Sequence, residues 1–537
     1  MTKEGLIGEL RGRLPGSASG TSLFASLRAD RLLLVATIVS SVAVLLPLFL
    51  TPFVPLQDLP NHVALASLLS HMSAGGEVSS YHFTGQPYPV PYWVGYMLIL
   101  VGAKITSPLF GAKLFVAAAL LVVPLGLIRL LPSLGRSPRL GLWAFALSWD
   151  YNMSWGFVSF QMATGLSLVY IAWAIDCLKA PHCRWQHLAV ALGFGTVIAL
   201  THAHATAVVS LALGVLALSE LPSWRHAIRL IQFSVAPFVG LLPWLIMGFS
   251  LKVAGSPWPH RVSELGYSPS AAERVGHLFN YTLDFIDGSV PESMMGVVFV
   301  VLLVIPLLLL APSRPRGDNW RRALVLYVFA WTIYLILPAS IIWPFPQLFI
   351  QQRHATLILL MGIALPSCEL TGRYAWRLAP GLIAVTLSVG VNLWLSYTFG
   401  KRSEPFLEII DAVPDESKVL PVLLKSDVPE SRLLLFHQFS AYVIAAKGGY
   451  SPYLFDTPNL VVRYQPERHL PHPSWAEPHK LSFEAHVPHY DYVLVQGKEK
   501  DPIRRQLKLG RLPKSLKLTQ IEEAGIWRLY EVERTGD

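Results

Sequence analysis

The sequence predicts an α-helical, polytopic membrane protein that carries a soluble C-terminal α/β domain. Hydrophobic residues make up 53% of the 537 residues and charged residues only 14%, whereas a soluble globular protein carries about 25% charged residues. Residues 400–537 hold 19 basic and 19 acidic residues, so the net charge of +9 falls entirely on residues 1–399. Long apolar runs fill that first part, and the first of them, at residues 32–50, is long enough to span a bilayer.

The positive charge of the first part indicates membrane orientation and contact with anionic lipid, not nucleic-acid binding. Residues 1–31 contain five basic residues and are interpreted as a cytoplasmic leader. The apolar run at residues 32–50 is too long for a signal-peptide core, and no small-residue cleavage site follows it. We therefore expect an uncleaved first span.

The next segment, residues 52–91, is the predicted first outer loop of the membrane domain. Lys and Arg are absent from Thr51 to Ala103, which favours the far side of the membrane. Prolines exclude a helix from residues 86–91, and the aromatic residues Tyr92 and Trp93 suit the membrane interface where the chain returns.

Residues 92–128 allow one bent crossing or two short ones, because Lys104, Pro108 and Lys113 separate two apolar pieces. The charges of the later loops favour one net crossing. Further spans are then expected near residues 140–153, 157–178, 188–202, 203–219, 230–250, 294–311, 323–343, 355–368 and 378–398. The total is about eleven spans in a membrane domain of residues 32–399, and an odd number places the tail outside.

This topology distributes basic residues unequally between the two sides. Thirteen lie in inside loops: Arg129, Arg136, Arg139, Lys179, Arg184, Arg225, Arg229, Arg314, Arg316, Arg321, Arg322, Arg373 and Arg377. Four lie in outside loops: Lys252, Arg261, Arg274 and Arg353. The bias agrees with the positive-inside rule, and two crossings within residues 92–128 would invert it.

The tail, residues 400–537, is predicted to be an extracytoplasmic α/β domain. Strand patterns occur at residues 419–424 and 491–495, and a helix is plausible at 436–446. Residues 516–521 and 526–532 are expected to pair as a hairpin.

Two groups of possible metal ligands have simpler explanations. Cys177, His182 and Cys183 lack a fourth ligand and fit a loop beside a membrane helix. Residues 463–489 contain scattered histidines among prolines without regular ligand spacing, so a proline-rich surface loop is favoured there. We expect no metal site, and the three cysteines cannot form a disulfide framework.

The most informative polar stretch is Gln57-Asp58-Leu59-Pro60-Asn61-His62, which directly follows the first span. Pro60 suits the first turn of a helix, so Asp58 is expected just before a helix N-terminus, where the dipole favours an ionised carboxylate. His62 is expected to project from the first turn. An ionisable pair at the membrane boundary is a functional hypothesis, and a helix start on a polar loop is the alternative.

Other polar residues are predicted to gather on the same outer face. They are Asp150, His202, His204, and the run Gln351-Gln352-Arg353-His354. No Walker loop, GxGxxG, GxSxG or HExxH motif occurs in the sequence, so the usual nucleotide, hydrolase and metalloprotease chemistries are unsupported.

The chain is arranged as a basic leader, one span, an outer loop that opens with Asp58 and ends in Pro91-Tyr92-Trp93, many further spans and an outer α/β tail. This arrangement resembles the GT-C superfamily of membrane glycosyltransferases. The resemblance to its protein mannosyltransferase-like members covers the whole chain, although the matching motif is short. It implies a polyprenyl-phosphate-linked sugar donor and a catalytic acid in the first outer loop. Many members pair that acid with a second one, whereas Gln57 precedes Asp58 here.

The resemblance implies that Asp58 is the general base that takes the acceptor's proton. Arg353, with Gln352 and His354, is a candidate for the departing phosphate, because a guanidinium matches phosphate oxygens in a fork; a lone Arg snorkelling at a helix end is the alternative. His62 and Asp150 are weaker substrate-binding candidates. His202 and His204 could serve one ligand only from an extended turn, since neighbours at i and i+2 on a helix face different ways, and polar caps on a helical hairpin are the alternative.

We therefore expect an inverting glycosyltransferase of the inner membrane, with the lipid-linked sugar, membrane lipid and a glycan, lipid or protein acceptor as partners and no cofactor. A transporter or flippase would place charged residues in the middle of spans. Charged residues at such positions are almost absent here. A non-catalytic component of a polysaccharide assembly system, or a ligase of lipid-linked glycans without an essential acid, would share the architecture.

Overall fold

The structure is a computed structural model of the chain. It describes residues 22–74, 78–84, 91–180, 185–250, 269–310, 318–341, 347–456, 460–497 and 512–534. Most of the predicted leader, residues 251–268 of the predicted outer loop, and His182 with Cys183 lie outside the described residues.

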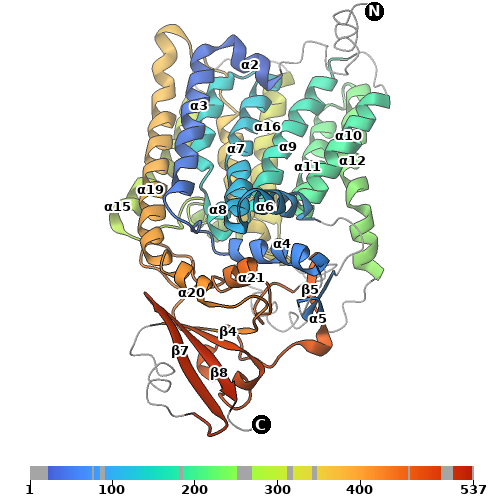
Figure 1. Cartoon of the computed structure of the whole chain (residues 1–537). Coiled ribbons are helices and arrows are strands. Elements are labelled where there is room, and N and C mark those ends of the chain that lie inside the picture. The colour runs from blue at the N-terminus through green and yellow to red at the C-terminus, as the bar shows by residue number, and fades with distance from the viewer. Residues whose placement is uncertain are drawn as a thin grey trace, which may run out of the picture.

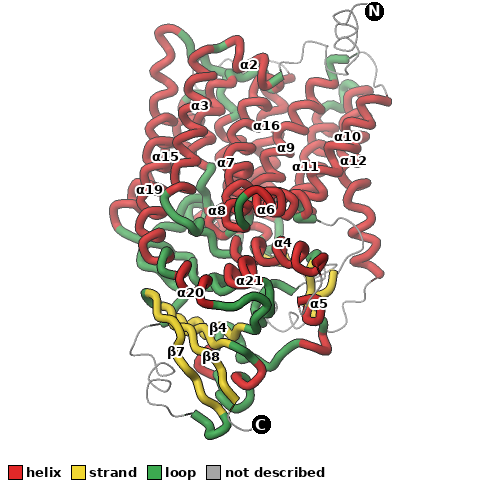
Figure 2. Tube along the Cα trace, in the orientation of Figure 1, coloured by secondary structure: helices red, strands yellow, loops and turns green. Residues whose placement is uncertain are grey.

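A bundle of upright helices makes up most of the chain (Figures 1 and 2). In the described ranges, six helical stretches are long and apolar enough to span a membrane. They are α3 with η1 (Arg31–Phe49), α7 (Pro108–Ser133), α9 (Val158–Cys177), α12 (Trp224–Ser250), α15 (Ser289–Leu308) and η3 with α19 (Gly372–Ser403). The other helices of the bundle are α10 (Trp185–Thr201), α11 (Ala203–Ser219), α16 (Asp318–Ile336) and α18 (Ala355–Ile363). Val35, Ile38, Val39 and Val42 of α3 are each more than half exposed, as lipid-facing residues of a multi-pass membrane protein are.

The predicted segment 92–128 forms two helices, and only the second is long enough to cross. Helix α6 (Trp93–Ile105) lies across the lower ends of the upright helices, and α7 crosses the bundle (Figure 1). The Ser107 side chain accepts a hydrogen bond from the Phe110 N–H at 3.2 Å, and Pro108 takes the first helical position, so α7 has a complete start signal. Gly111 allows the two helices to touch, because a Cβ there would meet the backbone of Ile99. One net crossing in this segment is the outcome that the sequence favoured.

The predicted span at residues 140–153 is not an α-helix. The chain forms a 3₁₀-helix, η2 (Pro138–Leu147), followed by the short helix α8 (Tyr151–Trp155). Every residue from Leu140 to Leu147 is buried, so this segment lies inside the bundle. A 3₁₀-helix rises about 2.0 Å per residue against about 1.5 Å in an α-helix, so ten residues travel further through the bundle than an α-helix of the same length.

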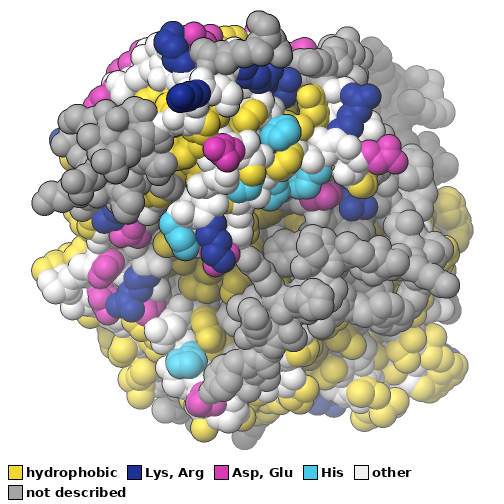
Figure 3. Space-filling model, turned by 90° about the horizontal axis from the view of Figure 1, so that it is seen from below, with side chains coloured by type: hydrophobic (Ala, Val, Ile, Leu, Met, Phe, Trp, Pro, Cys, Tyr) yellow, Lys and Arg dark blue, Asp and Glu magenta, His cyan; other side chains and the backbone are white. Residues whose placement is uncertain are grey.

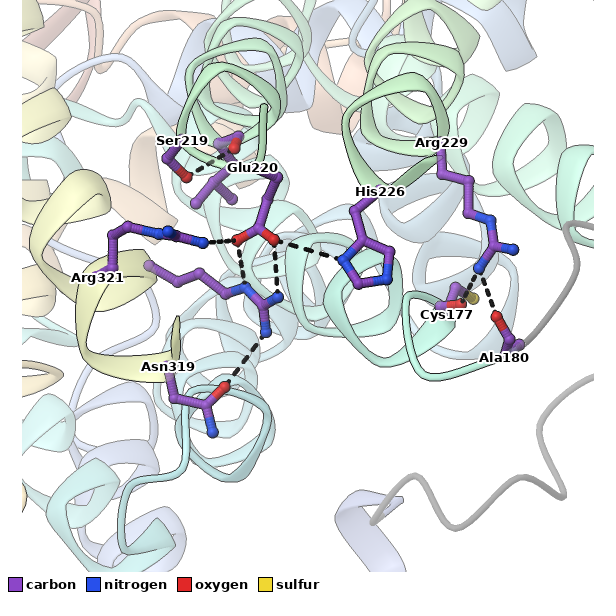
Figure 4. A network of polar contacts seen from close by, with 10 residues as sticks. Cys177, Ala180, Ser219, Glu220, His226, Arg229, Asn319 and Arg321 are labelled. Atoms are coloured by element: carbon purple, nitrogen blue, oxygen red, sulfur yellow. Dashed lines mark hydrogen bonds and ion pairs between the residues drawn. The ribbon is translucent and has the colours of Figure 1, made fainter. Parts of the chain in front are cut away.

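The two ends of the bundle carry different polar groups. At the upper end, ion pairs join Arg139 to Asp30 (2.5 Å) and Arg129 to Asp176 (2.6 Å). Figure 4 shows a further network at this end, where the buried Glu220 accepts from Arg321 at 3.1 Å and Arg322 at 2.9 Å. At the lower end lies the loop before α4 (Figure 1), and contacts join Arg353 of α17 to His202 at the start of α11 and to Asn152 of α8. The residues that the sequence assigned to one side of the membrane thus lie at one end.

The tail below the bundle contains a four-stranded sheet in the order β4-β6-β8-β7. Strand β4 (Val419–Leu423) is parallel to β6 (Tyr492–Gln496), and β8 (Trp527–Arg534) is antiparallel to both β6 and β7 (Leu516–Ala524). Gly525, with a φ of 59°, closes the β7–β8 hairpin that the sequence predicts. The predicted helix at 436–446 is shorter, because residues 435–440 form turns before α21 (Ala441–Lys447). From below, acidic, basic and His side chains are intermixed on the surface (Figure 3).

The tail packs directly against the first loop. The Phe53 ring lies 4.8 Å from the rings of both Phe439 and Tyr442, and Phe406 joins the same aromatic cluster. Strand β1 (His82–Thr84) pairs with β5 (Val462–Tyr464) of the tail. The remaining described elements are α2 (Leu23–Ala29), α4 (Leu59–Ala74), α5 (Val78–Tyr81), α14 (Ala271–Gly276), α17 (Ile350–Arg353), α20 (Phe406–Ala412), the strands β2 (Ser340–Ile341) and β3 (Gln347–Leu348), and the 3₁₀-helices η4 (Pro466–Arg468), η5 (Pro478–Lys480) and η6 (Val487–His489).

Candidate functional site

Asp58 lies where the first loop meets α8 and the start of α4. The Gln57 and Asp58 N–H groups donate to the carbonyls of Ser154 and Trp155, each at 3.0 Å. Gly156 adopts a φ of 91°, and a side chain there would collide with Asp58. Helix α4 begins at Leu59, so Asp58 directly precedes a helix N-terminus as the sequence predicts. The loop is therefore held in place by backbone pairing to α8.

The charge state of Asp58 differs from the expectation based on the helix dipole alone. The carboxyl is half-buried, and this burial raises its pKa to about 7. The positive charge of Arg353 and a hydrogen bond from Gln438 act in the opposite direction and do not cancel the effect. Burial disfavours the charged form of an acid. Asp58 therefore exchanges its proton near neutral pH.

His62 occupies the first turn of α4, beside Asp58 in the sequence and among aromatic rings. Its ring lies 5.6 Å from Tyr92 and 5.7 Å from Phe455, and Nδ1 is 3.4 Å from the Tyr96 hydroxyl. Burial and the charge of Arg353 lower the His62 pKa to about 4. His62 is therefore neutral at physiological pH and acts in the site as a polar, stacking side chain.

Arg353 ends the short helix α17, which enters through Phe349 in a left-handed conformation with a φ of 56°. The side chain is buried, and its guanidinium carbon lies 3.8 Å from the centre of the Phe157 ring. Nη1 is 3.1 Å from Nε2 of His202. The buried Nε–H has no hydrogen-bond partner among the described residues. Arg353 thus presents an uncommitted donor inside the protein.

Four other histidine and glutamine candidates lie around Arg353. His354 Nε2 is 3.1 Å from His204 Nε2, and Gln352 is buried one residue before Arg353. Helix α10 ends at Thr201 and α11 begins at Ala203, which leaves His202 extended with a φ of −163°. This break is the extended turn that the two histidines would need in order to serve one ligand, and it places His202 at Arg353 and His204 at His354.

Asp150 lies near these residues, but both of its carboxylate oxygens already accept hydrogen bonds within the protein. It is the N-cap of α8 and accepts from the Met153 N–H at 2.9 Å. Its other oxygen accepts from the Thr356 hydroxyl at 2.5 Å and from the Asn152 amide at 3.2 Å. Asn152 also donates to the Arg353 carbonyl at 3.1 Å. Asp150 therefore connects α8, α17 and α18, and its contacts are those of a positioning residue.

An apolar groove runs along α9, α11, α16 and α18. Its walls are apolar side chains such as Leu168, Val209, Phe329 and Leu360, and Asn152, Arg353 and His354 also line it. An apolar groove and a buried charged group therefore lie side by side. In the described part of the chain, no group of three or more His, Cys, Asp or Glu residues is arranged for a metal ion.

Comparison with solved structures found two chains of ArnT from Cupriavidus metallidurans. ArnT bound to undecaprenyl phosphate aligns with a TM-score of 0.52 and 11% identity over 93% of this chain and 97% of that chain. Apo ArnT aligns with a TM-score of 0.52 and 12% identity over 94% and 98%. This chain shares the fold of ArnT.

A third solved structure aligns less closely. The arabinofuranosyltransferase AftD from Mycobacteria aligns over 94% of this chain and 40% of its own at 14% identity, with a TM-score of 0.49. Comparison with models of protein families and with curated protein sequences gave no match.

Three residues of this candidate site were not identified from the sequence. Gln438 of the tail donates to Asp58 at 2.9 Å, Phe157 stacks under Arg353, and Asn152 binds both Asp150 and the Arg353 carbonyl. Asn152 was visible only as a neighbour of Asp150. Nothing in the sequence around Gln438 or Phe157 indicates that the fold brings them to the site.

Proposed function

We propose that this chain is a membrane glycosyltransferase that moves a sugar from a polyprenyl-phosphate donor to an acceptor hydroxyl. One observation carries the proposal: a buried arginine lies at an apolar groove and close enough to a titratable carboxyl to lower its pKa. Binding and reaction of a lipid-linked sugar phosphate require the apolar groove, the arginine and the carboxyl together. ArnT, which shares the fold, has been crystallised with undecaprenyl phosphate bound.

The groove suits the polyprenyl chain. Burying an apolar chain against apolar walls contributes roughly 25 cal/mol per Å². The groove lies between helices of the membrane bundle, so a lipid can enter from the bilayer side. The described lining residues include no Lys, Asp or Glu, and Arg353 carries its only full charge.

Arg353 is the proposed partner of the donor phosphate. A buried guanidinium is costly unless an anion compensates it, and Asp58 at a pKa of about 7 is only a partial counter-ion. The partnerless Nε–H and the guanidinium fork fit two phosphate oxygens. His202 holds one edge of the guanidinium, and Phe157 holds its face.

The reaction follows from these positions. The acceptor oxygen attacks the anomeric carbon, the bond from that carbon to the phosphate oxygen breaks, and polyprenyl phosphate leaves with the bonding electrons. The hydroxyl proton passes to Asp58, and the anomeric configuration inverts. Arg353 stabilises the negative charge that develops on the departing phosphate. The proposed site faces the outside of the inner membrane.

The test measures turnover of the donor without assuming the sugar. The full-length protein is reconstituted in membranes with undecaprenyl-phosphate pentoses and hexoses, and release of undecaprenyl phosphate is followed by mass spectrometry. Asp58→Asn should reduce the rate by about 10²–10⁴. Asp415→Asn, at an exposed acid of the tail, is the matched control and should retain activity. Normal turnover by a folded Asp58→Asn protein would exclude Asp58 as the base and favour a transport or scaffold role.

A further inference from the structure

We propose that Gln438 is a positioning residue through which the tail holds one oxygen of Asp58 as a hydrogen-bond acceptor, so that the acceptor's proton is taken by the other oxygen. This inference rests on the proposed role of Asp58 as the base. It assigns a part in the reaction to a tail residue 380 positions away in the sequence. It also makes the docked tail a component of the catalytic site.

Three hydrogen bonds form a relay from the tail to Asp58. The Phe455 N–H donates to Asn61 Oδ1 at 2.9 Å. Asn61 Nδ2 then donates to Gln438 Oε1. Gln438 Nε2 donates to Asp58 Oδ1 at 2.9 Å. Each step is between one donor and one acceptor, and each of the three hydrogen bonds crosses between the tail and the first loop with α4.

The direction of this relay is set at its beginning. A backbone N–H can only donate, so Asn61 must turn its oxygen toward Phe455. The Asn61 amide nitrogen then faces Gln438, which must present its oxygen there. Gln438 is left with its NH₂ group toward Asp58, and Asp58 Oδ1 must accept. A proton on Asp58 is therefore directed to Oδ2, and the hydrogen bond favours the ionised carboxylate over the protonated one.

The position of Gln438 depends on how the tail docks. Gln438 lies in the turns before α21, where the neighbouring Phe439 and Tyr442 pack against Phe53. A separate contact in the same interface joins the Leu434 N–H to Gln57 Oε1 at 3.0 Å. The relay and this second contact can be altered independently, because Gln57 makes no side-chain bond to Asp58 among the described contacts.

Other titratable groups near Asp58 stay in place when the relay is changed. Arg353 of α17 and Tyr92 at the start of α6 interact electrostatically with Asp58. His62 lies on α4, and His437 of the tail packs on Trp475 with ring centres 4.4 Å apart. Neither α8 nor the backbone that pairs with Asp58 adds a charged side chain at this point. In Gln438→Leu, which adds no charge, a change in the titration of Asp58 therefore reports the relay, whereas Asn61→Asp also brings a carboxylate that raises the Asp58 pKa by repulsion.

Two relay variants and one control test the proposal. Gln438→Leu removes the donor to Asp58. The pKa that governs the acid limb of the kcat/KM profile should then rise by about one to two pH units, as expected for losing a hydrogen bond to a charged group. Asn61→Asp leaves Asp58 and Gln438 intact, but the new carboxylate accepts from both Phe455 and Gln438. Gln438 must then present its oxygen to Asp58, so the shift should be at least as large. Gln57→Leu breaks the neighbouring tail contact and should leave the profile unchanged.

A second readout does not depend on activity. The carboxyl band of Asp58, assigned in infrared difference spectra of the wild type minus Asp58→Asn, should titrate at higher pH in both relay variants and normally in Gln57→Leu. An unchanged titration in folded Gln438→Leu and Asn61→Asp proteins would overturn the positioning role. Normal turnover by Asp58→Asn would instead overturn the proposed function, so the two failures are distinguishable.

Discussion

Arg353 and His202, 151 positions apart in the sequence, meet with Nη1 and Nε2 separated by 3.1 Å. A guanidinium only donates, so His202 Nε2 must accept and the imidazole must be neutral, with its proton on Nδ1. The contact uses one edge of the guanidinium, while Phe157 covers one face. The remaining donors of Arg353 are thus oriented before any substrate arrives, which reduces the entropy that substrate binding would otherwise cost.

Replacing this guanidinium by an ammonium is expected to weaken binding of the lipid phosphate. Arg353→Lys keeps the charge but loses both the fork and the stacking on Phe157. A hydrogen bond to a charged group contributes about 1.5–3 kcal/mol, so affinity should fall roughly tenfold to a hundredfold. Native mass spectrometry with undecaprenyl phosphate measures this directly. Arg402→Lys, which changes an ion pair with Glu430, is the control. Equal affinity of both variants would contradict the assignment of Arg353.

The rate of sugar transfer is expected to rise with pH between about 6 and 8. Asp58 has a pKa raised to about 7, and only its ionised form can accept a proton. Below that pH, kcat/KM should fall about tenfold for each unit, because the ionised fraction falls in that proportion. A flat profile across this range, with chemistry limiting, would contradict the role of Asp58.

The same shift predicts a pH dependence of stability. The folded protein binds the Asp58 proton more tightly than the unfolded chain, whose aspartates titrate near 3.9. The stability due to this proton is therefore present at low pH and is lost as pH rises from about 4 to 7. Asp58→Asn removes that dependence, so the melting temperature of the wild type relative to the variant should decrease over this interval.

Features determined by local patterns were predictable from the sequence. The start of α4 after Asp58, the β7–β8 hairpin around Gly525 and the break between α10 and α11 at His202 all have local signals in residue type and spacing. The order of apolar segments also indicated the membrane fold. These features depend on residues that are neighbours in the sequence, so a single sequence is enough to predict them.

Features determined by tertiary packing were not predictable. Residues 140–147 are apolar without exception, and that pattern does not distinguish the buried 3₁₀-helix η2 from a lipid-facing helix. The raised pKa of Asp58 depends on surrounding atoms from other elements. Gln438 reaches Asp58 because the aromatic cluster around Phe53 docks the tail, and no spacing rule connects residues so far apart.

Filling the apolar groove is expected to discriminate against long polyprenyl chains. Ala212 of α11 lines the groove and is almost fully buried, so Ala212→Phe should weaken binding of undecaprenyl phosphate while sparing a short prenyl phosphate that occupies only the Arg353 end. Leu211→Phe is the control, since Leu211 is 52% exposed on the same helix. Thermal unfolding identifies any loss of folding from overpacking. Equal loss of both ligands would place the lipid chain elsewhere.

The tail is expected to lie outside the cytoplasm, on the same side as Asp58. The two share one end of the bundle, since Gln438 of the tail bonds to Asp58. Basic loop residues favour the opposite end as cytoplasmic, by thirteen to four in the predicted topology. A phosphatase reporter that folds only outside the cytoplasm, fused after Asp537, should be active. A fusion after Ser219, at the upper end of α11, should be inactive and serves as the control. The reverse pattern, with both fusions inserted and expressed, would invert the protein in the membrane. The proposed site would then face the cytoplasm, and the sugar donor would have to be bound from that leaflet.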